Sequence, residues 1–260
     1  MYVRFALIAL VLLGGVFPIA VLAQSAADKS KLAYNEGLTL VRQQKYQEAL
    51  AKFDESIQLD PQNYRSLYMK GLTLARLNRV QEAIEAYRRT AELAQRAKDA
   101  RVEYLAHEQI GKIYTQQGKF DEALAAYDRA LAIAPAANRA ELLLAKGTVL
   151  IQQQNYEKAI PLLEEAVQSL KAADKGDAYW YLARAYNASG AFPKALEAAQ
   201  KAVELIPGGP AQKAKAYFEM GQAYRGLGRY NEARNAFQKA AVGPYRQAAL
   251  YELELLKNMN

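Results

Sequence analysis

A short phrase with an alanine in its third position recurs six times along the chain. These alanines are Ala49, Ala83, Ala123, Ala159, Ala195 and Ala233, and they lie 34, 40, 36, 36 and 38 residues apart. A small residue precedes each alanine by twelve positions, at Gly37, Gly71, Gly111, Gly147, Ala183 and Gly221. Large residues precede it by nine and by three positions. A chain that repeats with a period of this length folds as an array of similar units, each packed against its neighbours.

Each unit has the pattern of two helices joined by a tight turn. Helix-forming residues fill two stretches per unit and carry apolar residues at helical spacing. The turn between them holds Asn78, Gly118, Gly190 or Gly228, residues that tolerate the backbone angles of a tight turn. Two helices approach closely where one presents glycine or alanine and a bulky side chain of the other fills the space. The small residues therefore indicate close helix contacts.

The third unit resembles the tetratricopeptide repeat at Gly111, Tyr114, Gly118, Phe120, Ala123, Tyr127, Ala130 and Pro135. The first unit also fits, although Ser56 replaces its second alanine, whereas the second, fourth and sixth units lack the proline. Spacings above 34 residues indicate longer second helices or longer links. The resemblance implies an all-α fold, a right-handed solenoid of helical hairpins with about six units and a C-terminal capping helix.

The phase of the repeat predicts a solenoid over residues 30–243. Its units are expected at about 30–63, 64–103, 104–139, 140–175, 176–213 and 214–243. A last helix is expected within residues 244–260, with Ala249, Leu253 and Leu256 on one face. A solenoid exposes an apolar face at its end unless something covers it, so this helix is predicted to be a cap. The alternative is a helix that docks in a partner's groove.

Residues 1–23 have the pattern of a secretory signal peptide. A positive charge at Arg4 precedes an apolar run of nineteen residues that ends at Ala23. Val21 and Ala23 are small enough for the positions that signal peptidase reads, which predicts cleavage after Ala23 and a short linker at 24–29. The alternative is an uncleaved anchor facing the periplasm, because a run of this length can just span a bilayer. Either interpretation predicts an exported chain, with a bacterial periplasm as its destination.

The composition excludes several kinds of catalytic and metal site. The chain has no cysteine, which rules out disulfides, thiolate metal sites and cysteine nucleophiles. His107 is the single histidine, so no second histidine completes a site with it. We therefore predict no catalytic residue, no cofactor and no metal. The net charge is +7, but 34 basic residues alternate with 27 acidic ones, which argues against a nucleic-acid-binding arm.

The resemblance also implies where a partner binds, because the first helix of each tetratricopeptide unit lines the inner surface. Carrying this over predicts a groove of Tyr34, Tyr68, Arg76, Lys112, Trp180, Arg184, Phe218 and Arg225. Aromatic and arginine side chains suit an extended or helical peptide with apolar and acidic side chains. The alternative is that the aromatic residues pack between units. Chaperone-docking members of the family carry an asparagine just after the small residue, and none of the six units has one.

These features predict a protein-interaction scaffold in the cell envelope, with a protein or peptide as its partner and membrane contact only through a retained leader. An RNA-binding helical repeat protein is one alternative, which the excess of basic over acidic residues suggests. The export signal and the interspersed charges argue against it. A non-catalytic, membrane-anchored subunit of an envelope enzyme complex is the other alternative.

Overall fold

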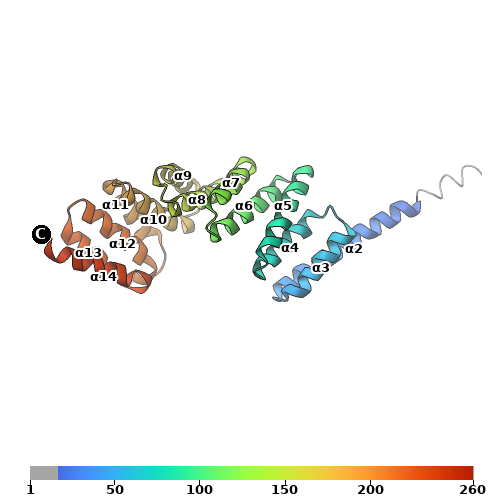
Figure 1. Cartoon of the computed structure of the whole chain (residues 1–260), viewed down its shortest axis with the longest axis horizontal. Coiled ribbons are helices and arrows are strands. Elements are labelled where there is room, and N and C mark those ends of the chain that lie inside the picture. The colour runs from blue at the N-terminus through green and yellow to red at the C-terminus, as the bar shows by residue number, and fades with distance from the viewer. Residues whose placement is uncertain (1–16, 260) are drawn as a thin grey trace, which may run out of the picture. The chain divides into compact units, whose positions relative to one another are not determined.

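A computed structural model describes residues 17–259 of the chain. These residues form thirteen α-helices, α2 to α14, and two short 3-10 helices, η1 and η2, and none of them belongs to a strand (Figure 1). The all-α prediction is confirmed. The structure divides into two compact units between Ile113 and Tyr114, inside helix α6. No helix within residues 17–259 is both long enough and apolar enough to cross a membrane.

The helices of the first unit are α2 (Phe17–Arg42), α3 (Tyr46–Leu59), α4 (Tyr64–Arg76), α5 (Val80–Arg96) and α6 (Ala100–Gln116). Consecutive helices pair as hairpins, α2 with α3 and α4 with α5. Residues 24–29, predicted as a short linker, are helical in the structure and continue α2 into the first repeat. Their sequence contains no glycine or proline that would end a helix. Most of the predicted signal peptide, residues 1–16, lies outside the described residues.

The second unit continues with α7 (Phe120–Ile133), α8 (Ala136–Gln152), α9 (Tyr156–Ser169), α10 (Ala172–Ala188), α11 (Phe192–Leu205), α12 (Pro210–Gly226), α13 (Tyr230–Ala240), η1 (Gly243–Tyr245), α14 (Arg246–Leu255) and η2 (Leu256–Asn258). A continuous buried cluster runs from Ala140 on α8 to Ala223 on α12. A second cluster joins Phe237 on α13 to Ala249 and Leu256. The C-terminal helix therefore caps the last hairpin, as predicted.

The small residues lie where the two helices of a hairpin touch, as the repeat pattern predicts. A methyl group added to Gly71 would lie 2.7 Å from the ring of Tyr87, and one added to Gly221 would lie 2.6 Å from the ring of Phe237. The six repeated alanines, Ala49, Ala83, Ala123, Ala159, Ala195 and Ala233, are all fully buried. Van der Waals contact between carbon atoms begins at about 3.5 Å, so these hairpins leave no room for a larger side chain.

A buried hydroxyl cluster explains the departure from the repeat at Ser56. Its hydroxyl group donates to the backbone oxygen of Ser30 at 2.8 Å and lies 2.7 Å from the hydroxyl oxygen of Ser66. The amide nitrogen of Asn63, the N-cap residue of α4, donates to the hydroxyl oxygens of Ser30 and Ser56 at 3.2 Å each. Three serines that are at most 1% exposed thus satisfy one another, as buried polar groups must.

Candidate functional site

Two of the predicted groove residues in the first unit are cations with partners inside that unit. Arg76 donates from Nη1 to the hydroxyl oxygen of Tyr46 at 3.0 Å, and its guanidinium carbon lies 5.5 Å from the centroid of the same ring. Lys112 forms an ion pair of 2.6 Å with Glu108, one turn earlier on α6. Both side chains are exposed, and whereas Lys112 is held in an ion pair, the contacts of Arg76 to Tyr46 involve no carboxylate.

The two predicted aromatic residues of the first unit lie against the rings that fill its hairpins. The ring centroid of Tyr34 is 6.2 Å from that of Phe53, and the centroid of Tyr68 is 5.7 Å from that of Tyr87. Burial raises the pKa of Tyr68 to about 12, and the nearby carboxylate of Glu108 adds to the effect. These contacts favour the alternative that both tyrosines contribute to packing.

Trp180 is also engaged in packing between repeats of the second unit. Its indole packs against Ala202 and Ile206 on and after α11 and against Ala216 on α12. The ammonium group of Lys215 lies 4.6 Å from the centroid of the indole ring. The indole nitrogen is buried, so a partner cannot reach it. This placement favours a structural role for Trp180 over the predicted role of a partner anchor.

The remaining three predicted residues, Arg184, Phe218 and Arg225, line one cavity of about 390 Å³ in the second unit. The rest of its lining is Tyr156, Asn187, Ala188, Phe192, Glu219, Gln222 and Gly226. We call this cavity the inner groove. Helices α10 and α12 supply most of its walls, because residues one turn apart on each helix face the same side. Its volume falls in the usual range for ligand pockets, roughly 300–1,000 Å³.

The capping helix neutralises one of the two arginines in the inner groove. Glu252 on α14 forms an ion pair with Arg225, and its carboxylate also accepts a hydrogen bond of 2.8 Å from the side-chain nitrogen of Gln222. The side chain of Glu252 is only 10% exposed. A carboxylate buried to this degree is stable only when it is paired and hydrogen-bonded, and this contact supplies both.

A second carboxyl group lies beneath the floor of the inner groove. Glu219 is 7% exposed, and its backbone and carboxyl oxygens each accept a hydrogen bond of 2.9 Å from the side-chain nitrogen of Asn187. Burial raises the pKa of Glu219 to about 7, although the Asn187 bond and the charge of Arg184 act in the opposite direction. Near pH 7 the group is therefore about half protonated, and it becomes largely uncharged only at lower pH.

One charge is left over in the inner groove. Arg225 is paired with Glu252, and Glu219 is only about half ionised near pH 7. Arg184 is exposed, and among the described residues it has no ion-pair partner, although its charge lowers the pKa of Glu219. The site therefore presents one guanidinium group without an ion-pair partner in a lining that also includes Phe218, and such a group can form a charge-assisted, bidentate bond with a carboxylate.

The pH dependence of stability tests the state of Glu219. Its pKa is 4.5 without the protein environment and about 7 in the folded chain, so the folded state holds the proton more tightly. The resulting stabilisation is fully present below about pH 4.5 and is lost as the pH rises through about 7. We expect Glu219→Gln to remove this decline, which amounts to a few kcal/mol. Thermal melts at about pH 5 and about pH 8 measure it. Glu204→Gln, at an exposed position on α11, is the control, and an equal decline in all three proteins would contradict the assignment.

Sequence profiles agree with the helical-hairpin architecture over most of the chain. A tetratricopeptide repeat profile matches residues 34–100 and 144–210, a second matches 101–172, and a third matches 214–242. The chain belongs to the tetratricopeptide repeat family. A search of the curated proteins finds no match.

Several solved tetratricopeptide structures share this fold. YrrB, described as a TPR protein with an unusual peptide-binding site, is 22% identical with a TM-score of 0.64, over 78% of this chain and 97% of its own. Pseudomonas aeruginosa pilF is 13% identical with a TM-score of 0.65, over 91% of this chain and all of its own. A chain of the APC/C hetero-tetramer Cut9-Hcn1 is 17% identical with a TM-score of 0.61, over 94% of this chain and 47% of its own. At these identities the likeness establishes the fold alone.

Sequence reasoning missed Asn187, Glu219 and Glu252 as parts of this site. Asn187 follows Arg184 by three positions, so helical spacing from a predicted residue could have indicated it. Glu219 directly follows Phe218, and neighbouring positions on a helix do not face the same side, so this spacing could not have indicated Glu219. Glu252 could not be found in this way, because it reaches the groove from the cap. Within residues 17–259, no group of histidine, aspartate and glutamate side chains is arranged to hold a metal ion.

Proposed function

We propose that this tetratricopeptide protein is an interaction scaffold that binds a segment of a partner protein in the inner groove. A carboxylate of the partner pairs with Arg184, and an apolar side chain of the partner lies against Phe218. The observation that carries the proposal is the exposed guanidinium group of Arg184, which has no ion-pair partner among the described residues and lines a cavity with aromatic walls. No catalytic role is assigned to this site.

The composition of the cavity walls supports a peptide over a small charged ligand. Tyr156, Phe192 and Phe218 provide apolar surface around the polar centre. Partner-binding hot spots are typically aromatic or arginine residues in a partly enclosed pocket, with less critical contacts around them. YrrB has a similar fold and is described as having a peptide-binding site. This description supports the proposal that the fold binds a peptide here as well.

The proposed setting of the scaffold is the cell envelope, on the exported side of a membrane. The support is the leader pattern in residues 1–23, with its positive charge, its apolar run and its small residues at Val21 and Ala23. N-terminal sequencing of the protein recovered from an envelope fraction tests the proposal. A chain that begins at Gln24 supports cleavage, a chain that begins at Met1 in the membrane pellet supports a retained anchor, and recovery from the cytosol alone would contradict export.

Arg184→Ala is the sharpest test of partner binding. The partner is first identified by pull-down from the organism's own envelope extract with mass spectrometry, and its affinity is then measured by calorimetry. Loss of a hydrogen bond to a charged group costs about 1.5–3 kcal/mol, so we expect affinity to fall by about tenfold or more. Circular dichroism should show no loss of helix, because Arg184 is exposed and unpaired.

Arg129→Ala is the matched control, because Arg129 is an exposed arginine on α7 outside the inner groove. It removes the same charge and should leave affinity unchanged. Equal losses in the two variants would show that only the overall charge matters. Phe218→Ala is less useful as a test, because the ring centroid of Phe218 lies 5.5 Å from those of Phe237 and Tyr245 and the change also disturbs the cap.

A further inference from the structure

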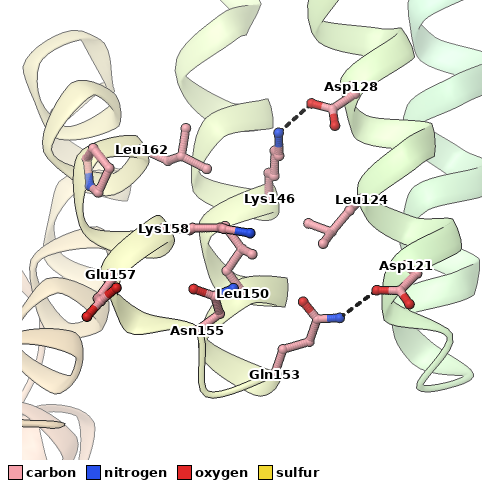
Figure 2. A pocket seen from close by; sticks show the side chains of 11 residues that line it. Asp121, Leu124, Asp128, Lys146, Leu150, Gln153, Asn155, Glu157, Lys158 and Leu162 are labelled. Atoms are coloured by element: carbon pink, nitrogen blue, oxygen red, sulfur yellow. Dashed lines mark hydrogen bonds and ion pairs between the residues drawn. The ribbon is translucent and has the colours of Figure 1, made fainter. Parts of the chain in front are cut away.

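A second groove lies on the second unit, among helices α7, α8 and α9, with a volume of about 870 Å³ (Figure 2). Its lining is Asp121, Leu124, Asp128, Lys146, Leu150, Gln153, Asn155, Glu157, Lys158, Pro161 and Leu162. We call it the outer groove. It shares no residue with the inner groove, so the two surfaces can be occupied and tested independently.

Apolar side chains from three helices converge in the outer groove. They are Leu124 on α7, Leu150 on α8, and Pro161 and Leu162 on α9. Figure 2 shows the side chains of Leu124, Leu150 and Leu162 around the open space, with the flexible side chain of Lys158 extending across it and the carboxylates of Asp121, Asp128 and Glu157 toward the edges. Apolar surface surrounded by polar groups is the usual composition of a protein-binding surface.

Some of the charged side chains that line the outer groove are paired with each other and others are not. Lys146 forms an ion pair with Asp128, and the side-chain amide of Gln153 donates to Asp121 at 2.9 Å (Figure 2). Three carboxylates line the groove, from Asp121, Asp128 and Glu157, against two ammonium groups. Asp121, Glu157 and Lys158 have no ion-pair partner in the described part of the chain, so two unpaired carboxylates lie against one unpaired ammonium group. The groove therefore has a small net negative charge, although the whole chain carries +7.

Pro161 adds a backbone acceptor at the same place. It lies inside α9, where a residue of any other type would donate its N–H group to the carbonyl oxygen of Glu157 four positions earlier. Because proline has no N–H group, that carbonyl oxygen lacks its usual helical donor. Glu157 and Pro161 both line the groove, where the carboxylates of Glu157 and Asp121 are hydrogen-bond acceptors.

We propose that the outer groove is a second docking site, which binds an amphipathic helix of a partner protein with large aliphatic side chains on one face and lysine or arginine at the flanks. The aliphatic side chains lie against Leu124, Leu150 and Leu162, and the basic side chains pair with Asp121 and Glu157. A helix forms its own backbone hydrogen bonds, whereas an extended strand needs a sheet edge to pair with, and no residue that lines this groove belongs to a strand. The required charge is opposite to that expected for the inner groove.

Two synthetic peptides test this site on the full-length protein. Both are fluorescein-labelled helices with leucines on one face; one has lysines at the flanks of that face and the other has glutamates. We expect fluorescence anisotropy to show the lysine peptide binding at least tenfold more tightly than the glutamate peptide. Addition of the lysine peptide should shift the methyl NMR signals of Leu124, Leu150 and Leu162. Tighter binding of the glutamate peptide, or shifts confined to the inner groove, would overturn the proposal.

A charge reversal with a matched control separates local recognition from overall charge. The double variant Asp121→Lys, Glu157→Lys reverses the rim at two exposed positions, and we expect it to weaken the lysine peptide about tenfold and to strengthen the glutamate peptide. The control is Glu122→Lys, Glu165→Lys, which makes the same charge change at exposed positions outside the groove. Equal losses in the two double variants would overturn the proposal. Arg184→Ala should leave lysine-peptide binding unchanged, and so distinguishes this site from the inner groove.

Discussion

Replacing Gly221 by leucine is expected to destabilise the second unit by about 3 kcal/mol or more, because it overfills a closed helix contact. Even a single added methyl group would lie 2.6 Å from the ring of Phe237, which is fully buried and has no space to move into. Phe237 also supports the buried Leu256 of the cap, so the damage extends beyond one hairpin. Differential scanning calorimetry should show the melting temperature falling by about 10 °C.

Gly228→Leu is the matched control for this change. Gly228 lies in the turn before α13 with φ of +71°, and a Cβ atom added there would meet no atom within 4 Å. Gly228→Leu should therefore lower the free energy of unfolding only through the backbone strain of a left-handed leucine, by about 1–2 kcal/mol. A loss at Gly221 no greater than the loss at Gly228 would show that the helix contact is not as close as described.

Trp180→Ala is expected to lower stability by about 3 kcal/mol, since truncating a packed tryptophan removes a large apolar contact area. The variant should lose contacts to Ala202, Ile206 and Ala216, which join three successive helices. It also loses the attraction between the indole ring and the Lys215 ammonium group, at about 0.5–1 kcal/mol. Circular dichroism melts measure the loss.

Trp180→Phe is the companion variant, because it keeps an aromatic ring in the same space and should retain most of the stability. Partner affinity measured on the folded fraction of Trp180→Ala completes the comparison. Undiminished affinity with lost stability agrees with the packing role that the structure indicates. An unchanged melting temperature with lost affinity would instead establish Trp180 as a contact residue of the partner-binding surface.

The fold was predictable from the sequence because local packing or backbone geometry restricts which residue type can occupy each repeated position. Gly71 and Gly221 must be small because a ring from the second helix of the same hairpin fills the space beside them. The turns predicted at Gly118, Gly190 and Gly228 have φ of +70°, +76° and +71°. Such requirements recur in every unit, so six imperfect copies reinforce one another.

The candidate site was less predictable, because its chemistry depends on contacts between neighbouring repeats and between the last repeat and the capping helix. Repeat phase placed Arg184, Phe218 and Arg225 on one surface, and the structure brings these three together in the inner groove. The repeat phase could not show that Trp180, on the same helix as Arg184, packs between repeats. Nor could it show that Arg225 is already paired, because Glu252 lies outside the repeating part of the chain.

The ion pair between Arg225 and Glu252 couples partner binding to the docking of the C-terminal helix. A partner carboxylate that takes Arg225 must displace Glu252, and the free energy of that displacement is subtracted from its intrinsic affinity. By thermodynamic reciprocity, such a partner also weakens the attachment of α14 by the same amount. A partner that uses Arg184 alone leaves α14 in place. The carboxylate of Glu252 on the capping helix thus competes with an acidic partner for Arg225 but not for Arg184.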